Sequence, residues 1–224
     1  MNIWIIMILV MVLSFIVQQM LQSRFKKYSQ RPTANGMSGA EVAQKMLRDH
    51  GIYDVKVVAT NGMLTDHFNP QTKTIALSEG VYGSRSVAAA AVAAHECGHA
   101  VQHAKGYAPL RMRSALVPVV SFASNIVQWI LLAGILMMHT FPGLLWFGII
   151  LFATTTLFSF ITLPVEINAS MRAISWLSNT GVTDSQTRPM AIDALKWAAY
   201  TYVIAALGSL ATLLYYIGIA RNRD

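Results

Sequence analysis

The stretch AHECGHAVQH, residues 94–103, lies in an alanine-rich segment and contains three histidines and one glutamate. Its first half matches the pattern HExxH at His95, Glu96 and His99. On a helix, residues four apart share one face, so these two imidazoles can bind a single metal ion. Glu96 is rotated to one side, where it can take a proton from a water that zinc has acidified. The stretch therefore predicts a zinc site on a helix.

A catalytic zinc site needs a third protein ligand. His103 is excluded because it is eight residues from His95, about 12 Å along a helix. Cys97 faces nearly the opposite way from the two histidines and is expected to be a small buried residue. Glu79, which follows a predicted strand, is a weak candidate. Glu166 is favoured, since a carboxylate directly after a long apolar segment needs an explanation; the alternative is a carboxylate stabilised by its helix N-terminus.

The composition indicates a membrane protein. Hydrophobic residues make up 54% of the 224 residues and charged residues only 12%, against about 25% charged in typical soluble domains. Four segments are long and apolar enough to cross a bilayer: Ile3–Leu21, Ala115–Met138, Gly143–Pro164 and Trp197–Ile219. The net charge of +7 is attributed to loops beside a membrane, and no nucleic-acid partner is expected because no Lys/Arg-rich run occurs.

Basic residues predict the orientation. Arg24, Lys26 and Lys27 follow the first segment, so the positive-inside rule places the loop after it in the cytoplasm of a multi-pass cell-membrane protein. Arg221 and Arg223 would then lie outside, which counts against the assignment. The expected organisation is an N-terminal transmembrane anchor (1–21), a cytoplasmic α+β lobe (22–114), a transmembrane helical hairpin (115–164), a cytoplasmic helix carrying the third zinc ligand (165–196) and a C-terminal transmembrane helix (197–224).

The lobe is predicted to contain a helix, a three-strand meander and a long helix. Ser38 and Glu41 form a capping-box pattern that begins the first helix. Three strands are expected near residues 55–58, 63–67 and 72–77, with Asn61-Gly62 as a hairpin turn between the first two. Ser84 or Ser86 caps the long helix that carries the HExxH motif. The fold class is therefore a mainly α membrane protein with about four transmembrane helices and a small α+β, zincin-like lobe.

These residues together resemble the YugP-like neutral zinc metallopeptidases, a family of membrane-bound bacterial proteins. The resemblance covers nearly the whole chain and is carried by the N-terminal anchor, TDHFNP (65–70), LSEGVY (77–82), AHECGH (94–99) and LPVEINAS (163–170) with Arg172-Ala173. It implies a glutamate-zincin-type peptidase acting on a polypeptide, with membrane proteins among the candidates. It also implies one zinc ion per chain, bound by His95, His99 and Glu166, with Glu96 as general base.

In many enzymes of that type an aspartate four residues after the glutamate ligand orients a histidine. This chain has Ser170 at that position, so Ser170, Asn168 or another carboxylate such as Asp66 is expected to replace it through hydrogen bonds. His67 and Tyr107 are candidates for oxyanion stabilisation, and Asp66 could hold the tautomer of His67; ordinary turn contacts of this Asp-His pair are nearly as well supported.

The strand at residues 72–77 is expected either to pair with substrate backbone as an added strand or to be an ordinary edge strand. Two other functions stay open. The HExxH helix could itself cross the membrane, as in an intramembrane protease, although its composition is a poor insertion signal. The chain could instead be a zinc-stabilised scaffold without turnover, which the intact Glu96 argues against. The sequence makes no prediction of oligomeric state.

Overall fold

The computed structural model describes residues 3–221. Its elements, in chain order, are α1 (Ile3–Tyr28), α2 (Gly39–Asp49), β1 (Lys56–Thr60), β2 (His67–Asn69), β3 (Thr74–Ser78), α3 (Glu79–Tyr82), α4 (Val87–Ala104), α5 (Ala108–Leu136), α6 (Pro142–Asn179) and α7 (Arg188–Arg221). They form two compact units. One comprises residues 3–16, 111–164 and 201–221, and the other comprises residues 17–110 and 165–200.

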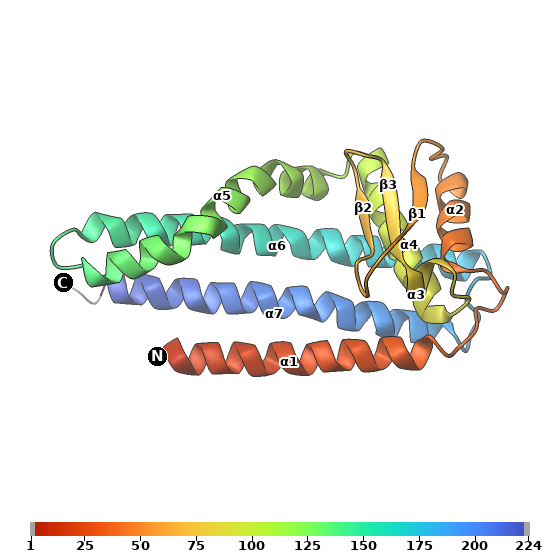
Figure 1. Cartoon of the computed structure of the whole chain (residues 1–224), viewed down its shortest axis with the longest axis horizontal. Coiled ribbons are helices and arrows are strands. Elements are labelled where there is room, and N and C mark those ends of the chain that lie inside the picture. The colour runs from red at the N-terminus through yellow and green to blue at the C-terminus, as the bar shows by residue number, and fades with distance from the viewer. Residues whose placement is uncertain (1–2, 222–224) are drawn as a thin grey trace. The chain divides into compact units, whose positions relative to one another are not determined.

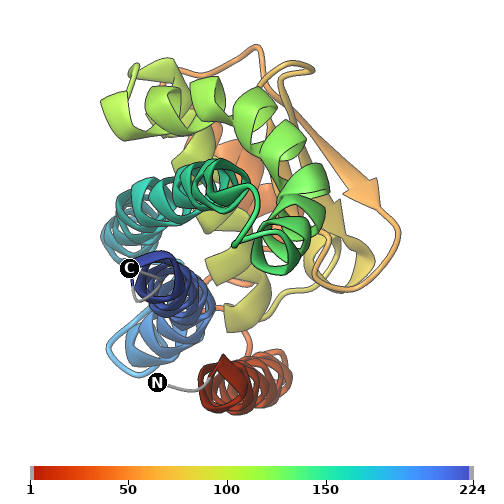
Figure 2. The same cartoon turned by 90° about the vertical axis from the view of Figure 1, so that its left-hand side faces the viewer.

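The first unit is helical and contains the most apolar parts of α1, α5, α6 and α7, the four helices that are long and apolar enough to cross a membrane. Within this unit α6 lies next to both α5 and α7 (Figure 2). Glycine permits the close approach of α5 and α6, because a β-carbon on Gly134 would lie 2.7 Å from the Leu145 Cα. Small residues at helix contacts are common in membrane helix pairs. The predicted mainly α membrane fold with a small α+β lobe is confirmed.

The second unit is built around α4, whose residues from Val87 to Gln102 are almost all buried. A helix that is apolar all round requires neighbours on every side, and here α2 and the sheet provide them (Figure 1). Ser86 caps α4 through the Ala89 amide. The predicted capping box of α2 is confirmed, with the Ser38 amide donating to Glu41 Oε2 at 2.7 Å.

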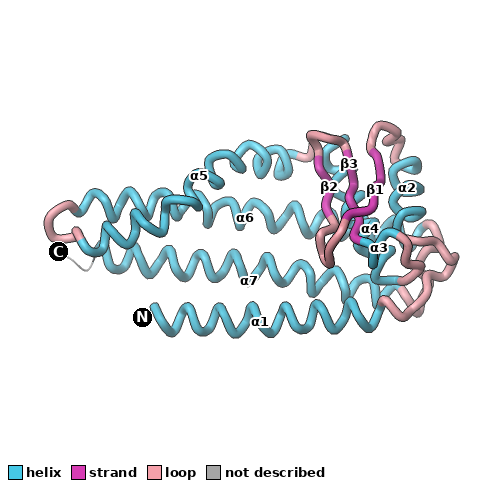
Figure 3. The backbone as a smooth tube through the Cα atoms, viewed as in Figure 1, coloured by secondary structure: helices cyan, strands magenta, loops and turns pink. Residues whose placement is uncertain are grey.

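The predicted meander is wrong. The strand order is β1-β3-β2 (Figure 3), and β1 is parallel and β2 antiparallel to β3. The turn residues Asn61 and Gly62 therefore do not join a hairpin, because β1 and β2 are not neighbours. The apolar β3 is buried from Ile75 to Ser78, whereas β1 and β2 are only partly covered. Burial thus favours β3 as the central strand, flanked by the two more exposed ones.

This order also removes one functional expectation. The strand at residues 72–77 is not the expected edge strand, because Thr74–Ala76 of β3 pair with β1 on one side and with β2 on the other. The pairs Val57–Ile75 and Phe68–Ile75 show that the same residue of β3 has a neighbour on each side. Only an edge strand presents unpaired backbone groups to another chain.

Helix α6 continues without a break through Pro164, where the sequence predicted the end of a span. Glu166 therefore lies well inside a helix and not at its start. The helix N-terminus cannot account for this carboxylate, because that effect is confined to the first turn. In the described chain, α4 is not among the helices long and apolar enough to span a membrane, which gives no support to an intramembrane HExxH helix.

Candidate metal centre

Three side chains of the second unit converge on one point. His95 and His99 extend from the same face of α4, and Glu166 extends from α6. The Nε2 atoms of the two histidines are 3.2 Å apart. Glu166 Oε2 lies 3.3 Å from His95 Nε2 and 3.5 Å from His99 Nε2. The two imidazoles and the carboxylate expected from the sequence are thus brought together, although 67 residues separate His99 from Glu166 (166 − 99).

These separations fit a zinc ion. Zinc binds imidazole nitrogen and carboxylate oxygen at about 2.0–2.1 Å in a tetrahedron, which places any two ligand atoms about 3.3–3.4 Å apart. The three distances in the cluster lie within about 0.2 Å of that value. Two histidines and one glutamate are also the donor set of a catalytic zinc site that keeps its fourth position for water or substrate. The geometry and the chemistry of the three donors therefore both fit a zinc site.

Gly98 explains how α4 and α6 come close enough for this arrangement. A β-carbon at Gly98 would lie 2.6 Å from the Ala169 carbonyl oxygen and 3.0 Å from its Cα. Such distances are incompatible with a side chain, so glycine between the two histidines lets the backbones touch. Ala169 is fully buried at this contact. The close approach brings Glu166, one turn earlier on α6, within reach of the histidines.

His95 is oriented by a serine. Its Nδ1 lies 3.1 Å from the Ser170 hydroxyl oxygen, one helical turn after Glu166 on α6. A proton on Nδ1 that is donated to this oxygen leaves the lone pair of Nε2 directed at the metal position. Of the groups considered for orienting a histidine, Ser170 is the one that contacts His95.

His99 is oriented by Gln102, a residue that the sequence reasoning missed. The Gln102 amide nitrogen donates to the Val165 carbonyl oxygen at 2.8 Å and to Asn168 Oδ1 at 3.0 Å. Because both partners are acceptors, the amide oxygen must face His99 Nδ1, which is 3.1 Å away. This oxygen can only accept, so Nδ1 carries the proton and Nε2 keeps its lone pair. The sequence contains one sign of this contact: Gln102 follows His99 by three residues, and residues three apart lie on the same face of a helix.

Burial and charge act against each other in the cluster. Glu166 is only 3% exposed, and burial alone raises its pKa, but when the two histidines carry a proton on Nε2 their hydrogen bonds outweigh that effect and lower the pKa far below its usual range. Burial lowers the pKa of His99, whereas the hydrogen bond with Glu166 and the charge of Glu96 raise it more strongly. The buried carboxylate is therefore held in its ionised form, which is the form that binds a metal.

Glu96 lies on α4 directly beside the cluster. It follows His95 on α4, is 8% exposed, and its charge acts on the neighbouring His99. Cys97, between the histidines, is fully buried and donates its thiol to the Ala43 carbonyl oxygen, at 3.4 Å. Burial raises the pKa of the Cys97 thiol well above its ordinary value. It therefore behaves as the small buried residue that the helical geometry predicted.

The other predicted residues are not joined to the cluster by the hydrogen bonds of the described chain. His67 is exposed on β2 and its Nδ1 lies 2.8 Å from the Thr65 carbonyl oxygen. Asp66 accepts from the Ser78 amide at 2.8 Å and from its hydroxyl, so it orients neither His67 nor a histidine of the cluster. The Tyr107 amide donates to the Gln102 carbonyl oxygen at the end of α4. The ordinary turn-contact interpretation of Asp66-His67 is the one that these contacts favour.

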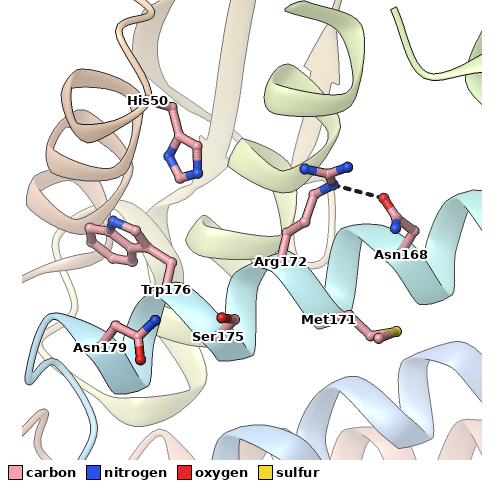
Figure 4. A pocket seen from close by; sticks show the side chains of 7 residues that line it. All are labelled: His50, Asn168, Met171, Arg172, Ser175, Trp176 and Asn179. Atoms are coloured by element: carbon pink, nitrogen blue, oxygen red, sulfur yellow. Dashed lines mark hydrogen bonds between the residues drawn. The ribbon is translucent and has the colours of Figure 1, made fainter. Parts of the chain in front are cut away.

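Asn168 joins the cluster only indirectly, and it extends the network outward. Its Oδ1 accepts from Gln102 and also from Arg172 Nε, at 2.7 Å. Arg172 and Asn168 line an open groove of about 380 Å³ (Figure 4). The rest of its lining comes from α6 and from the end of α2: His50, Met171, Ser175, Trp176 and Asn179.

Comparison with known proteins identifies a family and a relative of the chain. Residues 3–221 match the model of the family described as "Putative neutral zinc metallopeptidase". The chain is also similar to a protein of Bacillus subtilis (strain 168) described as "Putative membrane protease YugP". The two are 42% identical over 210 residues, which covers 94% of this chain and 92% of the relative. No solved structure matches the chain.

Proposed function

Because the chain belongs to the neutral zinc metallopeptidase family whose model it matches from residue 3 to residue 221, we propose that it is a membrane-bound endopeptidase. In this proposal His95, His99 and Glu166 bind one zinc ion, and the substrate is a polypeptide, with membrane proteins among the candidates. The observation that carries the proposal is the set of separations of 3.2, 3.3 and 3.5 Å among the three donor atoms. These are the separations that a tetrahedral zinc site requires.

Zinc in such a site supplies Lewis acidity to the scissile carbonyl and to the attacking water. The protein supplies the proton transfers. Glu96, beside His95 on α4, takes the proton of the water as it attacks the carbonyl carbon. The same carboxyl group then gives this proton to the leaving amine as the peptide bond breaks. Gln102 keeps His99 in the tautomer that leaves Nε2 for the metal, and the Ser170 hydroxyl can accept from His95 Nδ1 to the same effect.

Replacing Glu96 by glutamine tests this role, because the amide has nearly the same shape but cannot accept the proton. The variant should retain about one zinc ion per chain, and hydrolysis should fall by about a hundredfold or more. Membranes from cells producing either form can be compared for new peptide termini by mass spectrometry. Termini that are formed equally with the glutamine variant would exclude Glu96 as the base.

The fourth coordination position of the metal distinguishes a non-catalytic zinc scaffold from an endopeptidase. Cobalt substituted for zinc should give the absorption of a site with an exchangeable water. A closed site with four protein ligands would favour the scaffold. The spectrum does not depend on knowing a substrate, so it complements the comparison of termini.

The proposal also places the second unit in the cytoplasm, supported by Arg24, Lys26 and Lys27 after the apolar part of α1 and by the positive-inside rule. A cysteine scan tests this. In a Cys97→Ser background, a cysteine at exposed Met63 should react with a membrane-impermeant maleimide only after cells are permeabilised. A cysteine at His139, between α5 and α6, should react in intact cells. The reverse pattern would invert the topology.

A further inference from the structure

The groove described above contains an arginine that the proposed reaction does not use. Arg172 lies on α6, about two helical turns after Pro164, and is half-buried. Its Nε donates to Asn168 Oδ1 at 2.7 Å. Asn168 is itself held by the buried Gln102. The guanidinium is therefore fixed at one end, and its terminal amino groups are the ones left to bind a ligand.

No acidic side chain neutralises this arginine in the described chain. None of the seven residues that line the groove is Asp or Glu. The ion pairs of residues 3–221 include Arg24 with Asp193 and Arg85 with Glu41, but none with Arg172. A half-buried, preorganised guanidinium without a carboxylate partner is suited to a planar oxyanion, which it can bind through two parallel hydrogen bonds.

The remaining lining favours a ligand larger than a bare anion. Figure 4 shows His50 and Arg172 on the same side of α6, with the Trp176 ring beside His50. The Trp176 indole nitrogen already donates to Asp49 Oδ2 at 3.0 Å and the side chain is 7% exposed, so it offers the groove only a small apolar edge. Ser175 and Asn179 add exposed polar groups along α6. About 380 Å³ is near the lower end of the range for small-ligand sites, roughly 300–1,000 Å³.

We propose that this groove binds the free C-terminal carboxylate of a short peptide. Arg172 binds the carboxylate, Trp176 packs against the last residue, and the side chains of Ser175 and Asn179 hydrogen bond to the peptide backbone. The site is separate from the ligands of the metal. It does not depend on the proposed hydrolysis, so binding can be measured on protein from which metal has been removed.

The test uses the full chain in detergent after treatment with EDTA. Dansyl-glycylglycine is titrated as the free acid and as its C-terminal amide, and binding is followed by fluorescence anisotropy. The amide is the matched control for detergent and dansyl interactions. The acid should bind about tenfold or more tightly than the amide, since only the acid can form the charged pair of hydrogen bonds with Arg172. Equal binding of acid and amide would overturn the proposal.

Variants assign the preference to the groove. Arg172→Gln should remove the preference for the acid, and Arg172→Lys should reduce it, because lysine keeps the charge but not the planar fork. Arg188→Gln is the control, since Arg188 Nε donates to Ser178 and Arg188 is not part of the lining. Unchanged thermal unfolding of the variants shows that they fold. A preference that survives in Arg172→Gln would also overturn the assignment.

Competition identifies the source of the anion. Unlabelled glycylglycine should displace the probe at lower concentration than acetate or inorganic phosphate do. Displacement by acetate or phosphate at the same concentration as glycylglycine would exclude a peptide terminus as the preferred ligand. Neither result bears on zinc or on hydrolysis, so failure here leaves the proposed function to its own tests.

Discussion

Gly98 and Ala169 are in backbone contact: a β-carbon at Gly98 would lie 2.6 Å from the Ala169 carbonyl oxygen. Gly98 is on α4 between the two histidines, and Ala169 is on α6 between Glu166 and Ser170. The contact therefore lies at the centre of the residues that meet at the proposed metal position. It sets the spacing between the two helices that carry the three donors.

Gly98→Ala should separate these helices and weaken zinc binding. The new methyl group meets backbone atoms, which cannot rotate away, and overpacking of this kind typically costs about 1–3 kcal/mol. Gly80→Ala is the matched control, because a β-carbon at Gly80 meets nothing within 4 Å. Thermal unfolding and zinc content of the purified variants provide the measurements. Zinc content and stability like those of Gly80→Ala would refute the role of the contact.

Glu166→Ala should release zinc, because two histidines alone leave a site one protein ligand short. Glu79→Ala removes the other glutamate that the sequence left open as a ligand, and it should leave zinc content unchanged. Metal analysis after dialysis against a weak chelator distinguishes the two. If Glu79→Ala loses zinc and Glu166→Ala does not, the proposed ligand set is wrong.

Gln102→Leu should lower zinc affinity by about 10–100-fold, the usual effect of removing a group that orients a metal ligand. The variant leaves His99 Nδ1 without its acceptor and removes the two donations to α6. Gln102→Glu is the variant for comparison, because its carboxylate keeps an acceptor for the proton on His99 Nδ1. Competition with a fluorescent zinc chelator gives the affinities. A leucine variant that binds zinc as tightly as the wild type would show that Gln102 is only a packing residue.

Asp49 is expected to make the thermal stability of the folded chain depend on pH in the acidic range. The hydrogen bond from Lys45, followed by that from Trp176, lowers the pKa of this carboxyl in the folded chain. A lowered pKa contributes stability that is present above the unfolded value of about 3.9 and is lost as pH falls through the folded value. Metal-free Asp49→Asn should therefore unfold at a lower temperature than metal-free wild type at neutral pH. The difference should disappear in strong acid; a constant difference at all pH values would contradict this origin.

Local features of the sequence were enough to predict the parts of the fold that depend on local rules. The capping box of Ser38 and Glu41 depends on residues three apart, and the four apolar helices depend on length and composition. The pair His95 and His99 follows from helical spacing. In each case the residues concerned are close together in the chain, so the local sequence alone predicts how they are arranged.

The failures concern contacts between distant segments. Asn61-Gly62 suggested a hairpin, but the burial of Ile75 and Leu77 makes β3 central, and strand order is decided by such burial. The hydrogen bonds that link Gln102 with Val165 and Asn168 cross 63 and 66 residues. The residue pattern of a single helix cannot predict such contacts with a distant segment. Ser170 was predicted only because a resemblance pointed to its position.

The position of Glu166 on α6, late in the chain, affects when the proposed metal centre can form during synthesis. Both histidines and Glu96 are translated well before Glu166, and the apolar residues 143–164 come between them. Chains grow at about 5–20 residues per second and fold as they emerge. A nascent chain therefore contains the proposed base and two proposed donors for a time without the third, and the proposed centre can be completed only after residues 143–166 have been synthesised.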